Sequence, residues 1–216
     1  ARAQKVVVMA HGQEYLEVSE EKRRRMQALF HRVTHVVANS QATLAMMKAV
    51  VDIAHVKAGV IPPTYGLKDL ELTDPASQSS CRRLLSICRL EPRKGLQYVV
   101  EALGVLKNCT DFEWSIVGQG EFSTSIRAMI EAAGLSDRVK LLGYVDEANK
   151  QQLLRSADVF VMPTYQEGRS LEGFGIAYVE AARYGVASIA GVSGGVKEAV
   201  IDGFTGWNVV PLNHKA

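Results

Sequence analysis

The sequence predicts an α/β protein built on a parallel sheet with helices on both faces. Short runs rich in β-branched residues alternate with amphipathic, helix-like stretches along most of the chain. A strand–helix–strand order of this kind is typical of parallel sheets, because each crossover helix packs back onto the sheet. Of the 216 residues, 47% are hydrophobic, which suffices for one large core or for one and a half small ones.

The first part of the chain predicts three strands and two helices. Ser19, which precedes acidic residues, is expected to cap a helix that reaches about Arg32. Asn39 and Ser40 are expected to cap the second helix. The expected strands, the last of which is stopped by two prolines, are 5–10, 34–39 and 55–63.

A polar, turn-rich segment at 63–80 shows no clear periodicity and is interpreted as a linker. It separates an incomplete first domain at 1–62 from a second domain at 81–216.

The second domain shows regular alternation. Five strands are expected at 83–89, 112–118, 138–143, 157–163 and 186–191. Helices are expected at 95–107, 121–133, 147–156, 175–184 and 195–201, and a last strand around 207–210. Trp114 and Trp207 are expected in the core.

The bulk composition excludes several classes of protein. A net charge of +2 with 22% charged residues gives no argument for a nucleic-acid partner. No apolar run approaches the ~18 residues of a membrane span. The N-terminus does not resemble a signal peptide, and the three cysteines form neither a CxxC pair nor an even set, so we expect reduced thiols and a cytoplasmic location. The histidines lack metal-ligand spacing, so no metal site is expected.

Parallel sheets bind ligands beyond the carboxyl ends of their strands, and the loops there carry the candidate site. Arg89 follows one expected strand, and Lys94 precedes the next helix. Two cations at such an edge suit a pyrophosphate, since arginine offers a planar fork and lysine a point charge. The alternative is a solvated surface pair.

Gly118-Gln119-Gly120 follows a strand and opens a helix. A lone GxG is weak evidence and is often only a tight turn. The third glycine and the acid of a dinucleotide fingerprint are missing, which disfavours NAD, and no GxxxxGK[ST] phosphate loop occurs.

The stretch EGFGIAYVE, 172–180, combines a glycine-flanked helix start with two glutamates. Backbone N–H groups at a helix start accept phosphate or sugar oxygens, and Glu180 lies about 9–12 Å further along the helix. A carboxylate accepts two hydroxyl hydrogens, which suits vicinal diols. The pattern therefore favours a nucleotide sugar, with one glutamate on the sugar and the other on the ribose. The alternative is an acidic helix start that favours the helix dipole, followed by one exposed glutamate.

Five motifs in this order resemble glycosyltransferase family 4, the retaining group 1 glycosyltransferases of GT-B architecture. They are RLEPRKG (89–95), VGQGE (117–121), LLGYV (141–145), ADVFVMPTYQEGRSLEGFGIAYVEAARYG (157–185) and SGGVKEAVIDGFTGWNVV (193–210). The segments VVVMAHGQE and HVVANSQAT look like the end of that family's N-terminal domain. The resemblance implies two Rossmann-like domains, with the first only partly present and the second binding the donor.

The resemblance also implies roles for individual residues. Arg89 and Lys94 match the diphosphate-binding pair, and Glu172 and Glu180 match the E-x7-E motif, whose first glutamate contacts the donor sugar and whose second contacts the ribose. The remaining matches are Phe174, Gly175 and Ile176 as backbone donors, Tyr144 and Val145, after the glycine loop at Gly118, as the frame of the base, and His11 near the donor sugar.

The implied reaction is retaining transfer of a sugar from a UDP- or GDP-sugar to the hydroxyl of a glycan or lipid-linked acceptor. No Asp-x-Asp occurs, so Arg89, Lys94 and the helix start are expected to replace a metal, and no cofactor is expected. A double displacement would need a nucleophilic carboxylate. The family offers no agreed candidate, and a front-face route is the usual proposal; no general base is assigned.

Two alternatives stay open: a GT-B relative such as a sugar-nucleotide epimerase or a phosphorylase, and a non-catalytic nucleotide-binding chain. Family members are much longer, so this chain alone is expected to bind nucleotide weakly and to be poorly active. The charged helix at 20–25 is interpreted as a solvated face, with an anionic membrane patch at the inner leaflet as the alternative.

Overall fold

A computed structural model describes residues 5–64, 80–168 and 170–210. The chain divides into two compact units. Unit 1 comprises 1–64, 166–175 and 193–199, and unit 2 comprises 65–165, 176–192 and 200–216. Most of the expected linker at 63–80 lies outside the described residues.

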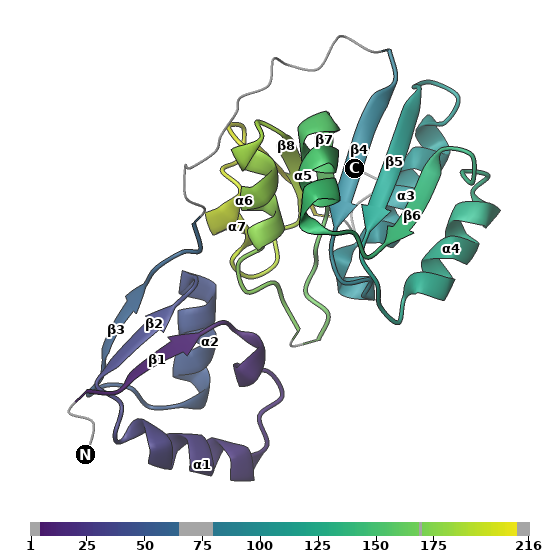
Figure 1. Cartoon of the computed structure of the whole chain (residues 1–216). Helices are drawn as coiled ribbons and strands as arrows, with labels where there is room; N and C mark the ends of the chain where they lie inside the picture. Colours follow the sequence, from purple (N-terminus) through teal and green to yellow (C-terminus); the bar gives the residue numbers. More distant parts are fainter. Residues whose placement is uncertain (1–4, 65–79, 169, 211–216) are drawn as a thin grey trace. The chain divides into compact units, whose positions relative to one another are not determined.

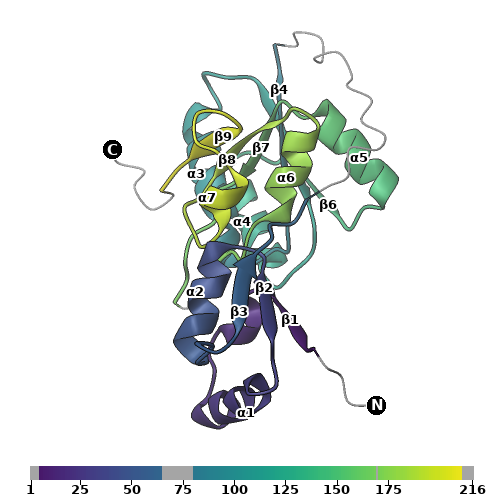
Figure 2. The same cartoon turned by 90° about the vertical axis from the view of Figure 1, so that its left-hand side faces the viewer.

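Unit 1 contains a three-stranded parallel sheet in the order β1-β2-β3. Its strands are β1 (Val7–Ala10), β2 (His35–Ala38) and β3 (Lys57–Val60). The 3-10 turn η1 (Gln13–Tyr15) and the helices α1 (Glu20–Phe30), α2 (Gln41–Val50) and α7 (Val196–Ala199) complete the unit. Figure 2 shows the strands side by side with α2 along them.

Both expected helix caps of unit 1 are confirmed. The Ser19 hydroxyl accepts a hydrogen bond from Lys22 N at the start of α1. The Ser40 hydroxyl accepts one from Thr43 N at the start of α2. These serines satisfy backbone donors that a helix start leaves without intrahelical partners.

Unit 2 contains a six-stranded sheet in the order β6-β5-β4-β7-β8-β9, and every neighbouring pair is parallel. The strands are β4 (Arg82–Ile87), β5 (Phe112–Val117), β6 (Val139–Gly143), β7 (Val159–Met162), β8 (Ala187–Ala190) and β9 (Gly206–Asn208). The helical elements of this unit are the 3-10 turn η2 (Pro92–Lys94) and the helices α3 (Leu96–Leu106), α4 (Ser123–Ala132), α5 (Glu147–Ser156) and α6 (Ile176–Arg183). The predicted parallel α/β architecture is confirmed.

Strand alternation places helices on both faces of this sheet. Phe112, Trp114 and Ile116 of β5 are buried in one cluster with apolar residues of α3 and α4. Phe160 of β7 packs edge-to-face on Tyr178 of α6, with ring centroids 5.7 Å apart. Figure 1 shows α5 and α6 in front of the sheet and α3 behind it. Because neighbouring residues of a strand point to opposite faces, one sheet serves two helix layers.

The two tryptophans differ in burial. Trp114 is fully buried, as expected, and its indole N–H donates to the Ser86 hydroxyl at 2.9 Å. The expectation for Trp207 is wrong, because this residue is 56% exposed. It lies on β9, the edge strand, whose buried neighbour is Gly206. None of the described helices is long and apolar enough to cross a membrane.

Candidate functional site

The candidate phosphate-binding residues follow β4. Arg89 is exposed, and its guanidinium lies 3.1 Å from Glu91 Oε1. The other oxygen of the same carboxylate contacts Arg93 Nε at 2.9 Å. Arg93 and Lys94 are both buried within η2. The sequence interpretation missed Glu91 and Arg93, although both stand inside the motif that carries Arg89 and Lys94.

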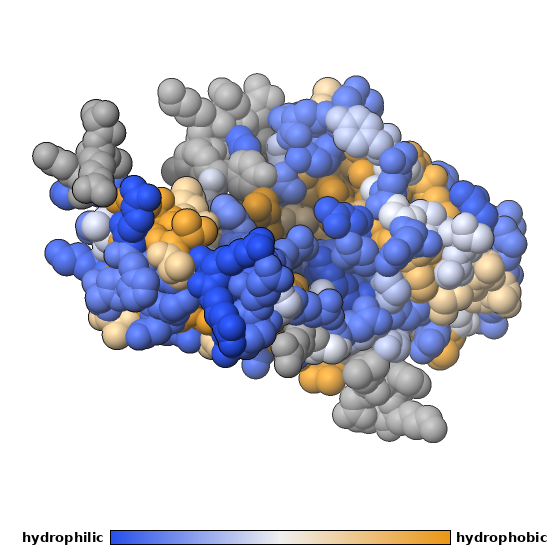
Figure 3. Space-filling model, turned by 90° about the horizontal axis from the view of Figure 1, so that it is seen from below, coloured by the Kyte–Doolittle hydropathy of each residue, from blue (hydrophilic) through white to orange (hydrophobic). Residues whose placement is uncertain are grey.

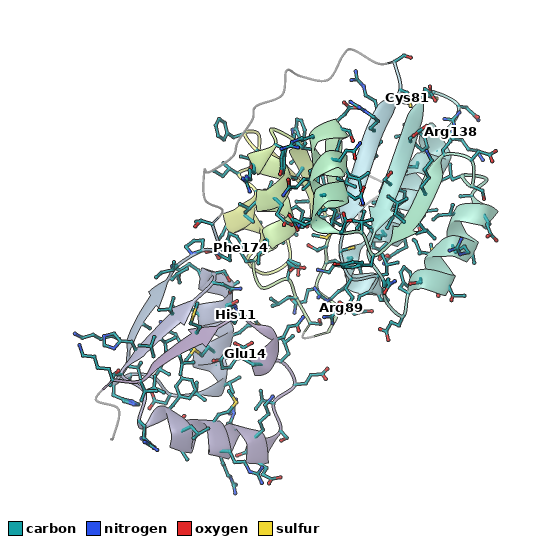
Figure 4. The ribbon with its side chains drawn as sticks, in the orientation of Figure 1. His11, Glu14, Cys81, Arg89, Arg138 and Phe174 are labelled. Atoms are coloured by element: carbon teal, nitrogen blue, oxygen red, sulfur yellow. The ribbon has the colours of Figure 1, made fainter. Side chains whose placement is uncertain are left out.

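Arg89 lies at the carboxyl end of the sheet of unit 2, and Cys81 and Arg138 lie at its opposite end (Figure 4). An exposed ion pair such as that with Glu91 is weak in water, at about 0–1 kcal/mol. Glu91 therefore orients the Arg89 side chain without holding it firmly, and an anionic ligand could compete for it.

Three glycines pack the carboxyl ends of the strands against one another. Gly95, with φ of 76°, lies between η2 and α3, and a Cβ there would stand 2.1 Å from the Pro163 carbonyl oxygen. A Cβ on Gly118 would meet the Cys88 carbonyl oxygen at 1.8 Å, and one on Gly120 the Leu90 carbonyl oxygen at 2.2 Å. The chain's own backbone thus requires these glycines, whether or not a ligand binds.

The loop after β6 carries Tyr144 and Val145. Tyr144 is 80% exposed, and Val145 is half-buried. Asp146 ends this loop by capping α5, where its carboxylate accepts from Asn149 N at 2.8 Å. An exposed tyrosine on a loop fixed by a helix cap offers an aromatic face to a ligand such as a nucleobase.

Helix α6 begins directly after Gly175, whose φ of 93° favours glycine. Ile176 opens the helix, and Glu180 lies one turn further on with only 12% of its side chain exposed. Lys150 Nζ of α5 donates to Glu180 Oε1 at 2.7 Å. The sequence interpretation missed Lys150, because Lys150 and Glu180 are 30 positions apart and no sequence pattern predicts their contact.

In unit 1, His11 directly follows β1. Its backbone N–H donates to Glu14 Oε1 at 2.6 Å, and Figure 4 shows the two residues close together. The Asn39 amide donates to the His11 carbonyl oxygen at 3.2 Å. A Cβ on Gly173 would stand 2.4 Å from that same oxygen. The structure therefore brings His11 beside the segment that carries Glu172 and Phe174.

Hydrogen bonds also fix the backbone around Glu172. Glu172 N donates to the Ser193 hydroxyl at 3.3 Å, and Gly195 N donates to the Glu172 carbonyl oxygen at 2.9 Å. The Ser40 hydroxyl donates to the Gly173 carbonyl oxygen at 2.6 Å. Phe174 is buried at 4% exposure. The position of the Glu172 backbone is thus set from both sides.

The predicted site residues fall into two groups. Arg89, Lys94, Gly118, Tyr144, Val145, Ile176 and Glu180 belong to unit 2, and His11, Glu172, Phe174 and Gly175 belong to unit 1. The unit 2 group combines cations with a half-buried carboxylate, a set suited to a phosphorylated, hydroxyl-rich ligand. Among the residues that the structure describes, no three His, Cys, Asp or Glu side chains are grouped to hold a metal ion.

Comparison with known proteins identifies relatives. The family model Glycosyl transferases group 1 matches residues 73–216. A GDP-mannose-dependent monoacylated alpha-(1-6)-phosphatidylinositol monomannoside mannosyltransferase of Corynebacterium glutamicum is 31% identical over 93% of this chain and 55% of its own length. The amylovoran biosynthesis glycosyltransferase AmsK of Erwinia amylovora is 31% identical over 70% of this chain and 36% of its own length.

Solved structures give the same architecture. HepE of Anabaena, in a complex with UDP, superposes with a TM-score of 0.78 at 25% identity over 96% of this chain and 58% of that chain. Its complex with UDP-glucose gives a TM-score of 0.75. The chain spans about half the length of the relatives it matches.

Proposed function

Because the chain belongs to the glycosyl transferases group 1 family, we propose that it contributes the donor-binding half of an enzyme that transfers a sugar from a nucleoside diphosphate sugar to an acceptor hydroxyl. The observation that carries this proposal is the cationic loop after β4, where Arg89 and Lys94 stand at the carboxyl end of a parallel sheet. Parallel sheets of this kind bind nucleotides at that edge.

In this proposal Arg89 and Lys94 bind the diphosphate. The leaving nucleoside diphosphate gains negative charge in the transition state, and fixed cations stabilise such charge. Lys94 is held within η2, so little reorganisation is needed when the charge develops. The backbone donors at Phe174, Gly175 and Ile176, at the start of α6, add the positive end of the helix dipole.

Two carboxylates bind the hydroxyl groups of the donor. Glu180 accepts hydrogen bonds from the ribose diol, and Glu172 accepts them from the transferred sugar. The base lies against Gly118 after β5 and against the loop of Tyr144 and Val145 after β6, where Tyr144 is exposed. His11, whose backbone is tied to Glu14, lies on the side of the sugar.

The proposed reaction retains the configuration at the anomeric carbon and needs no metal. The bond between the anomeric carbon and the leaving phosphate oxygen breaks while the acceptor oxygen bonds to the same face of that carbon. The acceptor proton passes to the departing phosphate oxygen. Arg89 and Lys94 take the role that a metal ion would otherwise have, and no side chain of this chain is assigned as general base.

The relatives suggest which donors and acceptors to test. The names of the mannosyltransferases give GDP-mannose as their donor and phosphatidylinositol mannosides as their acceptors, and HepE was crystallised with UDP-glucose. We therefore propose a UDP- or GDP-sugar as donor, and a glycan or a lipid-linked sugar as acceptor.

A lipid-linked acceptor would place the protein at the cytoplasmic face of the inner membrane. The surface over α1 is hydrophilic (Figure 3). Its arginines Arg24 and Arg25 pair with Glu20 and Glu21 one turn earlier. These two pairs leave Lys22 and Arg23 of α1 without an acidic counterpart on the helix, a modest positive charge, so we propose that any association with anionic lipid is peripheral.

Calorimetry tests the proposal. The chain is titrated with UDP, GDP, uridine and guanosine, and we expect one diphosphate to bind at least tenfold more tightly than its nucleoside, since charge-assisted contacts contribute about 1.5–3 kcal/mol each. Arg89→Ala should remove most of this difference. Arg82→Ala is the matched control, because Arg82 is exposed at the other end of the same strand.

Two results would count against the proposal. One is an unaltered chain that binds neither diphosphate. The other is an equal loss of affinity in the Arg89 and Arg82 variants, which would indicate a general charge effect without a defined site.

A further inference from the structure

Lys150 of α5 connects two carboxylates on neighbouring helices. Its ammonium lies 2.7 Å from Glu180 Oε1 on α6 and 2.9 Å from Glu147 Oε2 on its own helix. Lys150 is 20% exposed and Glu180 is 12% exposed, whereas Glu147 is 66% exposed. The pair with Glu180 is therefore the partly buried one, and Glu147 supplies an outer, solvated partner.

Lys150 stays charged in this position. Burial lowers the pKa of Lys150, but the hydrogen bonds with Glu180 and Glu147 outweigh this effect and hold the pKa above its usual value. This ammonium makes a charge-assisted hydrogen bond to one oxygen of the Glu180 carboxylate. It also fixes the rotation of a side chain that could otherwise take several rotamers.

This geometry has a consequence for ligand recognition. A carboxylate that accepts two hydroxyl hydrogens from a diol must present its oxygens in one orientation. The contact with Lys150 supplies this orientation before the ligand arrives. A carboxylate that had to be reoriented on binding would lose affinity through ordering of its side chain.

We propose that Lys150 is a positioning residue, which holds the Glu180 carboxylate in the orientation that accepts the ribose diol of a nucleoside diphosphate. This inference rests on the proposed function. A purely structural role, in which Lys150 only holds α5 and α6 together, makes a different prediction. In that case the effect of replacing Lys150 on affinity would not depend on the hydroxyl groups of the ligand.

The test pairs a protein variant with a ligand variant. UDP or GDP, whichever binds the unaltered chain, is titrated alongside its 2′,3′-dideoxy analogue, which lacks the diol. We expect Lys150→Met to weaken binding of the ribose form about tenfold, the usual size of one charge-assisted contact. The dideoxy form should bind the variant and the unaltered chain equally well.

Several variants keep the test interpretable. Lys150→Arg retains the charge and should restore most of the affinity, and Lys150→Gln serves if Lys150→Met does not fold. Lys140→Met is the matched control, because Lys140 also pairs with a glutamate, Glu113 at 3.2 Å, on the exposed surface of β5 and β6. Circular dichroism checks that each variant is folded.

The outcomes separate the two proposals. Equal losses for the ribose and dideoxy ligands, or no loss for either, overturn the positioning role of Lys150 while the proposed function stands. If the unaltered chain binds neither UDP nor GDP, the proposed function itself fails, and the role of Lys150 fails with it.

Discussion

The chemistry of single residues was only partly visible in the sequence. Arg89 and Lys94 could be identified because they lie five positions apart in one loop, so the sequence alone shows that they are close together. The contact between Lys150 and Glu180 could not be, since it depends on how α5 and α6 pack on the sheet. Local sequence motifs can identify the residues that bind a ligand. The residues that orient those side chains can be identified only from the tertiary structure.

The glycines show the same limit. Gly173 belongs to the glycine-flanked helix start that was expected to bind phosphate or sugar oxygens, but the space beside it is occupied by the His11 carbonyl oxygen, 2.4 Å from where a Cβ would stand. A glycine in a sequence marks a close approach or an unusual φ without saying what approaches. Only the structure distinguishes packing within the chain from contact with a ligand.

The two motif glutamates should differ in what they recognise. Glu180→Gln is expected to raise the dissociation constant of the nucleoside diphosphate about tenfold, because it weakens a contact with the ribose diol. Glu172→Gln should leave that constant unchanged and weaken only the binding of the nucleotide sugar. Calorimetry with UDP and UDP-glucose, or GDP and GDP-mannose, measures both. The opposite pattern would mean that the two roles are exchanged.

At the level of helices and strands, the sequence predicted the elements well. The helix starts after Ser19 and Ser40 were confirmed because side-chain capping is a local interaction. The order of the strands could not be predicted, since it depends on which strands pair. The wrong expectation for Trp207 has the same origin, because β9 proved to be an edge strand.

Close backbone packing at the ends of the strands gives a stability prediction. Gly120→Ala should destabilise the protein by about 1–3 kcal/mol, the usual cost of overpacking, because the new Cβ would stand 2.2 Å from the Leu90 carbonyl oxygen. Gly59→Ala is the control, since a Cβ there meets nothing within 4 Å. Urea unfolding compares the two, and equal stabilities would contradict the packing argument.

A second prediction concerns the amino ends of β4 and β7. The Asp158 carboxylate accepts from Arg83 N at 2.7 Å and pairs with the Arg83 guanidinium at 3.2 Å. Burial raises the pKa of Asp158, but the hydrogen bonds from Arg83 outweigh it and hold the pKa below its usual value. A depressed pKa stabilises the folded state above the unfolded pKa of about 3.9, and this stability is lost as the pH falls through the folded value.

Asp158→Asn should therefore lower the free energy of unfolding at pH 7 by about 1–3 kcal/mol. The difference from the unaltered chain should begin to shrink below about pH 4, where the carboxylate becomes protonated in the unfolded chain but not yet in the folded one. Urea titrations at pH 7 and pH 3.5 measure this, with the exposed Asp137→Asn as control. A difference independent of pH would show that charge at Asp158 does not matter.

At the level of the whole molecule, fold and family follow from the order of many motifs, and function does not follow from the fold alone. The parallel sheet, the family match and the relatives agree on the architecture. The donor, the acceptor and the stereochemical course depend on hydroxyl groups that a protein reads with individual side chains. These remain proposals, and each can be tested with a ligand.

The most direct measurement is a diffraction experiment on a crystal of this chain soaked with UDP-glucose or GDP-mannose. The account predicts electron density for the diphosphate within hydrogen-bonding distance of Arg89 and Lys94, and for the ribose beside Glu180. Density for the sugar should lie beside Glu172. A nucleotide sugar bound far from these four residues would contradict the central claim.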